Sequence, residues 1–252
     1  MKKALLIMAS FLGGVFIFLS LVDKSNYVIE RQLWHVQKKF DRIALDSKTV
    51  PDAEFEEVAE SYRKIMKRFP HSQITPRVPL QIGKVYTLKK DYKKAREILY
   101  EMVKQNSSNS NLSAEALADI AWIYELENNW SEALNIYEGI IEKYPLSNVG
   151  INTPIYIAEY YQKNNNPSQA KAAFNKAITF YKKVSRENPN SLYDFTALRL
   201  LASALFSTEE WQQGIEVLGK VLNNYPDPEY LSPERANLLL KSINMIDRKS
   251  VV

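Results

Sequence analysis

Residues 4–22 form an uninterrupted apolar stretch, whereas the rest of the chain carries apolar positions at helical spacing. The stretch contains nineteen residues without a charge, and Lys2 and Lys3 precede it. As a helix it would rise about 28 Å, close to the hydrocarbon thickness of a bilayer. Because basic residues mark the cytoplasmic side of a membrane helix, residues 1–24 are predicted to be a single-pass anchor in the inner (cytoplasmic) membrane, with the N-terminus inside.

A cleaved secretory signal is the alternative interpretation of this segment. Such a signal needs small residues one and three positions before the cut. Near suitable positions, the segment offers only Gly13, Gly14 and Ser20 as small residues. If Ser20 were the residue just before the cleavage site, the second small residue would be needed at position 18, which is Phe18. The pattern favours a retained anchor, and both interpretations place residues 25–252 outside the cytoplasm.

Four segments after residue 25 repeat one pattern of small and large apolar residues. Each has a small residue, a large apolar residue three positions later, and another small residue nine positions beyond that. The four sets are Gly83–Tyr86–Ala95, Ala121–Tyr124–Ala133, Ala158–Tyr161–Ala170 and Ala202–Leu205–Gly214. Two antiparallel helices approach closely only where small residues face each other, and a residue three positions on lies about one turn away. Each segment is therefore predicted to be a pair of antiparallel helices.

Turn and cap signals fall between the two helices of each segment. Asp91, Asn129 and Asn166 stand where N-caps are needed, and Gln169 completes a capping box with Asn166. The second helix of the third segment is predicted to be about two turns longer than the others, with its apolar face unchanged.

The ends of the repeat region are predicted from the same spacing. A further second helix is expected at about residues 52–69, preceded by a first helix over residues 26–46. The apolar positions of that first helix are Leu33, Val36, Phe40, Ile43 and Leu45. A solitary last helix over residues 232–248 is predicted to cap the stack. Residues 25–252 would then hold about five helix pairs and a C-terminal capping helix.

These residues resemble the tetratricopeptide repeat (TPR) family, whose signature is W-x₂-L-G-x₂-Y, then A-x₃-F, then P. Residues 118–145, ADIAWIYELENNWSEALNIYEGIIEKYP, match it best, and the resemblance covers about residues 52–245. It implies an all-α fold, a TPR helix-hairpin superhelix (α-solenoid), that mediates protein–protein interaction. The long repeat period and the segment 67–72 are similar to bacterial cell-envelope members, such as the TPR lipoprotein of outer-membrane assembly. That protein's lipidation cysteine has no counterpart here.

Composition removes several classes of function. The chain has 33 basic and 29 acidic residues, a nearly even balance that does not provide the basic surface needed to bind nucleic acid. It has no cysteine, which excludes a disulfide framework, a thiol nucleophile and a thiolate zinc site. Its two histidines, His35 and His71, fall in different elements, and the neighbouring carboxylates Glu56 and Glu57 are predicted to point to different faces of one helix. The chain is predicted not to be an enzyme and to need neither a cofactor nor a metal.

The candidate binding residues are implied by the TPR resemblance. In that family, exposed positions of the first helices line a concave groove that takes a protein or peptide partner. The matching positions here are Lys84, Trp122, Tyr156, Glu159, Arg199 and Phe206. Trp122 follows the small Ala121 and should point away from its partner helix, although it could instead pack against the neighbouring first helix.

The predicted function is a membrane-anchored, extracytoplasmic (periplasmic) scaffold for cell-envelope assembly. The alternative is a carbohydrate- or cell-wall-binding protein that uses its many tyrosines. That alternative would need exposed tyrosines gathered on one surface. The tyrosines in repeat register are predicted to be buried instead: Tyr62, Tyr86, Tyr124, Tyr137 and Tyr161.

Overall fold

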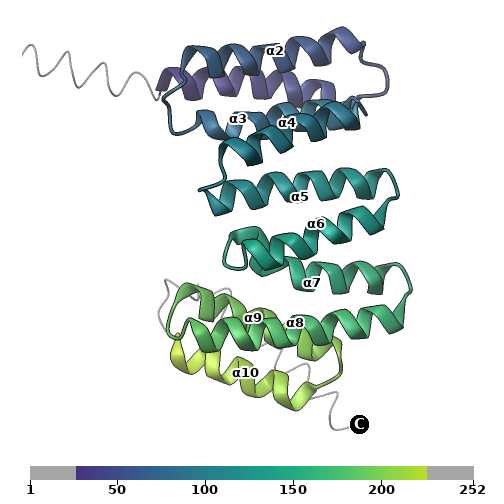
Figure 1. Cartoon of the computed structure of the whole chain (residues 1–252), viewed down its shortest axis with the longest axis vertical. Coiled ribbons are helices and arrows are strands. Elements are labelled where there is room, and N and C mark those ends of the chain that lie inside the picture. Colours follow the sequence, from purple (N-terminus) through teal and green to yellow (C-terminus); the bar gives the residue numbers. More distant parts are fainter. Residues whose placement is uncertain (1–26, 226–252) are drawn as a thin grey trace, which may run out of the picture. The chain divides into compact units, whose positions relative to one another are not determined.

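The computed structural model describes residues 27–225, which are helical apart from turns and short connections (Figure 1). The first helix covers residues 27–45. The elements that follow are α2 (Asp52–Arg68), the short 3₁₀ helix η1 (Thr75–Arg77), α3 (Val78–Leu88), α4 (Tyr92–Gln105), α5 (Ser110–Leu126), α6 (Trp130–Lys143), α7 (Asn148–Lys163), α8 (Pro167–Glu187), α9 (Leu192–Ser207) and α10 (Trp211–Asn224). The predicted all-α architecture is confirmed for this part of the chain.

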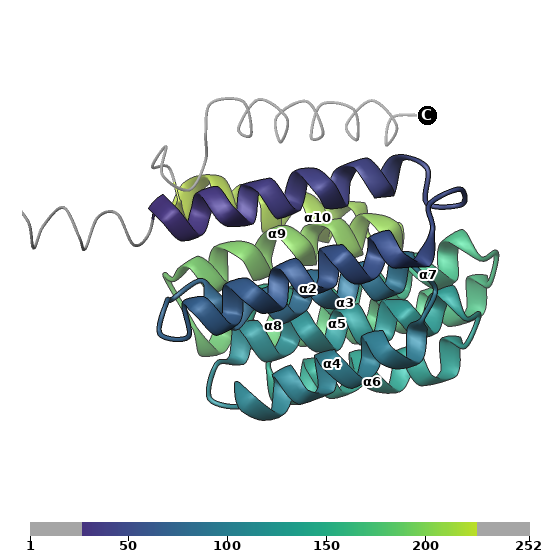
Figure 2. The same cartoon turned by 90° about the horizontal axis from the view of Figure 1, so that it is seen from above.

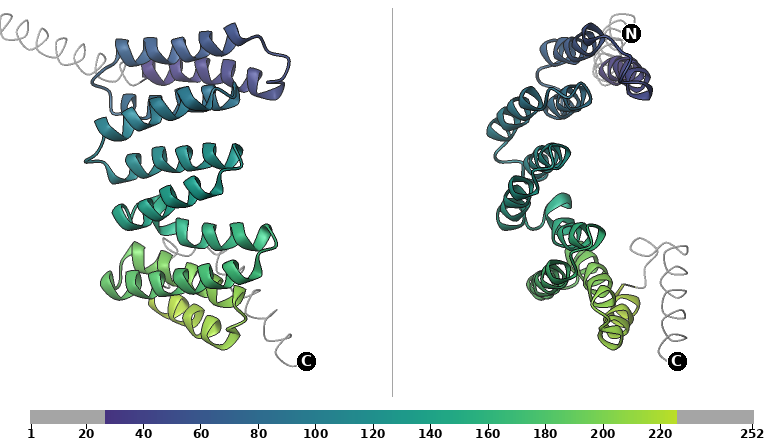
Figure 3. Two further views of the ribbon diagram at one scale, coloured as in Figure 1. Left: turned by 45° about the vertical axis from the view of Figure 1, so that its right-hand side comes forward. Right: turned by 90° about the vertical axis from the view of Figure 1, so that its right-hand side faces the viewer.

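The chain divides into two compact units between Glu127 and Asn128. The described part of unit 1 runs from the first helix to the end of α5, and that of unit 2 from α6 to α10. In unit 1 the first helix, α3 and α5 lie on one side, and α2 and α4 lie on the other (Figure 3, right). No helix within residues 27–225 is both long and apolar enough to span a bilayer. The anchor predicted at residues 4–22 and the cap predicted at residues 232–248 lie outside the described residues.

Small residues allow the helices of a pair to pack closely, as the repeat pattern predicts. A Cβ added to Gly83 in α3 would meet the Leu99 side chain of α4 at 2.9–3.3 Å. A Cβ added to Gly214 in α10 would overlap the Phe206 ring of α9. Ala158 is completely buried where α7 packs on α8. These positions accept a small side chain only, because the partner helix occupies the space that a larger one would need.

The predicted helix caps are present, and a left-handed residue precedes each of them. The Asp91 carboxylate accepts a hydrogen bond from the Lys94 backbone N–H at 3.1 Å, and Asn129 and Asn166 accept equivalent bonds. The residue before each cap has a positive φ, with values of 65° at Lys90, 58° at Asn128 and 54° at Asn165. The turns therefore reverse the chain without glycine.

The long second helix of the third segment is confirmed as α8, which has 21 residues. Its buried residues follow one face at spacings of three and four: Ala170, Ala173, Phe174, Ala177, Ile178, Tyr181 and Val184. The buried Tyr181 hydroxyl accepts a hydrogen bond from the Ile155 backbone N–H at 3.2 Å, next to Pro154 inside α7. A proline inside a helix displaces the backbone carbonyls of the preceding turn, and the Tyr181 hydroxyl supplies an acceptor for the backbone N–H of Ile155.

The apolar face predicted for the first helix is correct except at its end. Val36 and Ile43 are buried, and Leu33 and Phe40 are half-buried. Leu45, however, is 88% exposed, because it lies two residues after the buried Ile43 and therefore about 200° further round the helix, on the side away from the core. Ile29, which was not among the predicted positions, completes the buried face.

Candidate protein-binding groove

A groove of about 390 Å³ lies in unit 1 between the first helix, α3 and α5. Its lining residues are mostly apolar or aromatic, with two lysines among them: Phe40, Ser47, Lys84, Thr87, Leu88, Lys90, Tyr92, Trp122 and Leu126. Two of the six predicted binding residues, Lys84 and Trp122, come together in it. They are 38 positions apart in the sequence and belong to successive repeats.

The small buried residues position Lys84 and Trp122. Gly83 and Ala121 face their own neighbouring helices, and the next residue lies about 100° further round the helix. Lys84 is exposed and Trp122 is 47% exposed. The tryptophan therefore presents about half of its surface to the groove, and the other half is packed against the protein.

The charge of the groove lining is positive. Lys84 and Lys90 are both exposed, and no carboxylate is among the lining residues. Asp119 of α5 lies close enough to Lys84 to feel its charge. Burial raises the pKa of Asp119, and the Lys84 ammonium partly opposes that rise. The groove thus combines an apolar interior with two ammonium groups.

Two ion pairs hold α5, which carries Trp122, against the preceding helices of unit 1. The Arg77 guanidinium donates to both oxygens of Glu115, at 2.7 and 3.2 Å. Arg96 of α4 pairs with Glu127 just after α5, and its guanidinium lies 4.5 Å from the ring centre of Tyr124. These contacts fix both ends of α5.

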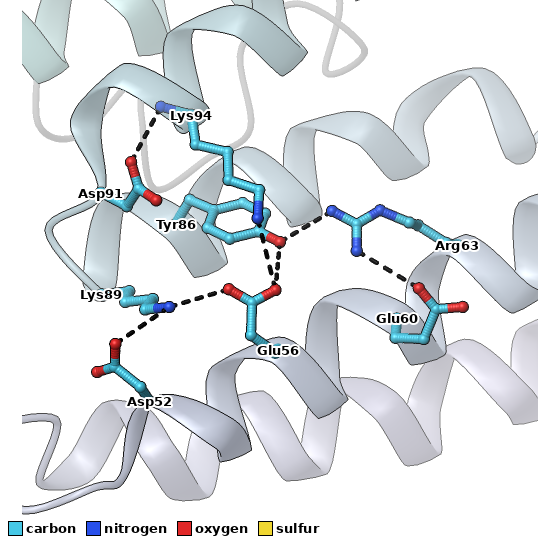
Figure 4. Close-up of polar contacts among 8 residues, drawn as sticks. All are labelled: Asp52, Glu56, Glu60, Arg63, Tyr86, Lys89, Asp91 and Lys94. Carbon is cyan, nitrogen blue, oxygen red and sulfur yellow. Dashed lines mark hydrogen bonds and ion pairs between the residues drawn. The ribbon is translucent and has the colours of Figure 1, made fainter.

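A polar network holds α2 against α3 and α4 (Figure 4). The Glu56 carboxylate of α2 accepts hydrogen bonds from the buried Tyr86 hydroxyl at 2.7 Å and from Lys89 Nζ at 2.9 Å. Lys94 Nζ lies 3.6 Å from the same carboxylate, and Arg63 donates to the Tyr86 hydroxyl at 2.9 Å. Burial raises the pKa of Glu56, but the bonds from Lys89 and Tyr86 and the charge of Lys94 outweigh it and lower the pKa to about 2. The carboxylate is therefore ionised and holds α3, and with it Lys84, in position.

The pattern of charges in the sequence indicated only part of this network. Glu56 and Glu57 do point to different faces of α2, because Glu57 pairs with Lys39 of the first helix at 2.6 Å. The partners of Glu56 are 30 or more positions away, and nothing in the local spacing indicated them.

The other four predicted binding residues lie in unit 2 and differ in their surroundings. Tyr156 is 39% exposed and packs edge-on against Tyr137, with ring centres 5.2 Å apart. Glu159 and Arg199 are exposed. Phe206 is half-buried, since its ring stacks on Trp211 and covers Gly214 inside its own helix pair. Phe206 therefore contributes to packing between α9 and α10.

Unit 2 contains a hollow that the sequence did not indicate. It measures about 410 Å³ and lies between α6, α7 and α8, with Leu134, Pro154, Ala173 and Phe180 among its apolar lining residues. None of the predicted binding residues lines it. Within residues 27–225, no cluster of three or more histidine, aspartate or glutamate side chains could hold a metal ion.

The tyrosines in repeat register are buried or half-buried. Tyr62, Tyr86 and Tyr137 are buried, and Tyr124 and Tyr161 are half-buried. Among residues 27–225 the exposed tyrosines lie on four different helices: Tyr27 on the first helix, Tyr100 on α4, Tyr156 on α7 and Tyr193 on α9. Tyrosine burial therefore gives no support to the carbohydrate-binding alternative.

The family model of Iml2/Tetratricopeptide repeat protein 39 matches residues 4–193, and a tetratricopeptide repeat model matches residues 196–228. The chain is therefore a TPR protein. It belongs to the Iml2/Tetratricopeptide repeat protein 39 family. A search of curated proteins found no match.

Several solved structures are similar in fold. The TPR-like repeats of a Podosopora anserina protein are 13% identical, covering 81% of this chain and 98% of that one, with a TM-score of 0.41. A TPR protein from Parabacteroides merdae is 15% identical, covering 86% and 75%, with a TM-score of 0.40. The TPR2AB domain of yeast Sti1, solved in complex with pHSP90, is 14% identical, covering 88% and 99%, with a TM-score of 0.39.

Proposed function

We propose that the groove of unit 1 binds a segment of another protein. TPR repeats form protein-interaction scaffolds, and this chain is a scaffold of that class. The observation that supports the groove as the binding site is the meeting of Lys84 and Trp122 in one apolar hollow of about 390 Å³. Partly buried aromatic side chains commonly contribute most of the binding energy at such interfaces.

The chemistry of the lining defines the partner segment. Phe40, Leu88, Trp122 and Leu126 offer contacts to an apolar side chain, and the Lys84 ammonium offers an ion pair beside them. A segment with a large apolar residue flanked by a carboxylate fits both features. Positive charge at the groove would also accelerate the encounter with an acidic partner.

The proposal extends to a membrane location for the scaffold. Residues 4–22, preceded by Lys2 and Lys3, would form a single-pass inner-membrane anchor that leaves the TPR repeats on the extracytoplasmic side. Anchoring would raise the local concentration of the scaffold near membrane-bound partners. A role in cell-envelope assembly rests on the similarity of residues 67–72 and of the repeat period to envelope TPR proteins.

The groove is tested by placing a photo-crosslinking amino acid in full-length chains in native membranes. One chain carries it at Trp122, and the matched control carries it at Tyr100, an exposed aromatic residue on α4, in the opposite layer of unit 1. A protein captured from position 122 and not from position 100 would then be purified. Its affinity should fall about thirtyfold for Trp122→Ala and little for Tyr100→Ala.

Circular dichroism should show unchanged helicity in both alanine variants. If Trp122→Ala and Lys84→Ala bind the captured protein as tightly as the wild type, the groove is not the binding site. Arg199→Ala in unit 2 distinguishes the remaining possibility, because binding lost only in that variant would place the site on α9.

A further inference from the structure

The first helix carries an exposed stripe of aromatic, aliphatic and basic residues on the face opposite its core contacts. Tyr27, Arg31, Trp34, Lys38 and Leu45 are separated by steps of three, four and seven, which return to about the same side of a helix. Tyr27 is 62%, Trp34 56% and Leu45 88% exposed. Figure 2 follows this helix from its first described residue to the loop that leads into α2.

The charges around the stripe are arranged in two groups. Lys39 and Arg42, on the flank nearer to α2, form ion pairs with Glu57 and Glu54 of that helix. Arg31 and Lys38 form no ion pair with any described residue, and Lys38 Nζ lies 5.4 Å from the Trp34 ring centre.

Two acidic residues lie on the other flank of the stripe. They are Glu30, which borders a shallow surface hollow next to Trp34, and Asp41, which accepts a hydrogen bond from Gln37 at 2.8 Å. Glu30 is four residues before Trp34 and Asp41 is seven residues after it, so these two carboxylates border one edge of the stripe, and Arg31 and Lys38 lie on its other side.

The position of the stripe in the chain indicates what covers it. Tyr27 comes five residues after the end of the apolar segment 4–22. Five residues extend at most about 18 Å. With that segment in a bilayer, the first helix must begin within or beside the headgroup region. Tryptophan and tyrosine are enriched at this depth, and helices with an apolar and basic face lie in the plane of the interface.

We propose that the first helix lies flat on the membrane surface, with Tyr27, Trp34 and Leu45 in the interface and Arg31 and Lys38 against anionic lipid headgroups. This inference rests on the proposed anchor and adds a second membrane contact that orients unit 1. The ring and aliphatic surface is removed from water, and the two unpaired cations meet phosphate groups. Leu45 is decisive, because a helix that continued straight out of the membrane would carry it about 27 Å further from the surface than Tyr27.

Because the chain has no cysteine, a single introduced cysteine is the only thiol that a fluorophore can label in the full-length chain. Full-length chains with Trp34→Cys, Leu45→Cys or Glu97→Cys would be labelled with a small fluorophore. They would then be reconstituted into nanodiscs of phosphatidylcholine and phosphatidylglycerol. Glu97 is the matched control, because it is exposed on α4 in the same unit. Lipids brominated in their acyl chains should quench the labels at positions 34 and 45 at least about twofold more than the label at position 97, since an interfacial face sinks to the acyl boundary.

The charge contribution is tested in the same discs. Arg31→Gln and Lys38→Gln should each reduce the lipid-contacting population about fivefold in the anionic mixture and have little effect in pure phosphatidylcholine. Lys93→Gln, an exposed lysine on α4, is the control and should have no effect.

The outcomes separate this inference from the anchor. Quenching at 34 and 45 but not at 97 supports the flat orientation. Equal, weak quenching at all three positions in chains that stay in the discs overturns it and leaves the anchor standing. Chains that leave the discs overturn both, while the groove proposal is unaffected. If, without lipid, the labels at positions 34 and 45 become shielded from solvent as the protein concentration rises, the stripe binds a second copy of the chain. That result would also overturn the inference.

Discussion

Units 1 and 2 share one repeat pattern but hold their helices together by different chemistry. In unit 1 the contacts between helices include the Glu56 network and the Arg77–Glu115 and Arg96–Glu127 pairs. In unit 2 they include an aromatic cluster in which Trp130 stacks on Tyr160, with ring centres 3.4 Å apart. The small residues that define the repeat set how closely helices approach, and they leave the chemistry of the remaining contacts free to differ.

The difference predicts that the two sets of contacts respond differently to pH. The contact of α2 with α3 depends on a carboxylate whose ionised form is stabilised by its partners, whereas the stacking of Trp130 of α6 on Tyr160 of α7 does not titrate in the acid range. Hydrogen exchange read by mass spectrometry resolves the two units in one experiment, because protection is measured helix by helix.

The largest effect is expected from Asp194, the buried carboxylate of unit 2. It accepts hydrogen bonds from the Tyr225 hydroxyl at 2.5 Å, the Ser185 hydroxyl at 2.6 Å and the Asn190 backbone N–H at 3.2 Å. Asp194→Ala leaves these donors unpaired and should lower the free energy of unfolding by about 3–4 kcal/mol, measured by urea unfolding. Asp194→Asn keeps an acceptor and should lose about half as much. If Asp194→Ala is no worse than Asp194→Asn, the hydrogen bonds do not hold α8, α9 and α10 together.

A smaller effect is expected from Glu56 in unit 1, and it should depend on pH. Its folded-state pKa of about 2 lies below its ordinary value of 4.5, so its contribution to stability is complete above about pH 5 and is lost as the pH falls toward 2. Glu56→Gln should destabilise unit 1 by about 1 kcal/mol at pH 7, a figure discounted for the partial exposure of the carboxylate.

The measurement is hydrogen exchange in α2 and α3 at pH 7 and at pH 3, with rates corrected for the intrinsic effect of pH. The difference between wild type and Glu56→Gln should shrink at pH 3. Protection of α7 and α8 serves as the internal control and should be the same in both proteins. A difference that is as large at pH 3 as at pH 7 would show that the charge of Glu56 is not what holds α2 to α3.

The smallest effect is expected from the left-handed turns, where the units can be compared directly. Lys90 in unit 1 and Glu209 in unit 2 have φ values of 65° and 64°, in a region unfavourable for side chains of this kind. Lys90→Gly and Glu209→Gly should each raise the free energy of unfolding by up to about 1 kcal/mol. Asn165→Gly, at a φ of 54°, should change little, because asparagine tolerates this conformation. Thermal unfolding of the three variants is the test, and equal shifts in all three would refute this explanation.

Much of the fold was predictable because it depends on residues close together in the sequence. The N-caps at Asp91, Asn129 and Asn166 form hydrogen bonds over three positions. The small residues Gly83 and Ala158 indicate which face of each helix packs against its partner. The groove was predictable to a lesser degree. Lys84 and Trp122 follow small residues and meet as expected, whereas Phe206 packs inside its own pair because the missing side chain of Gly214 leaves room for its ring.

The sequence by itself determined the helices, their caps, their close-packed faces and the TPR class, since helical periodicity and capping are local properties of the chain. Only the tertiary structure decided that Glu56 meets Tyr86 and Lys89, that Asp194 meets Tyr225, and that the first helix leaves Trp34 and Leu45 uncovered. The contacts of Glu56 and of Asp194 join residues about 30 positions apart in the sequence. Whether such residues touch depends on the register and crossing of packed helices, which the period of a single helix does not specify.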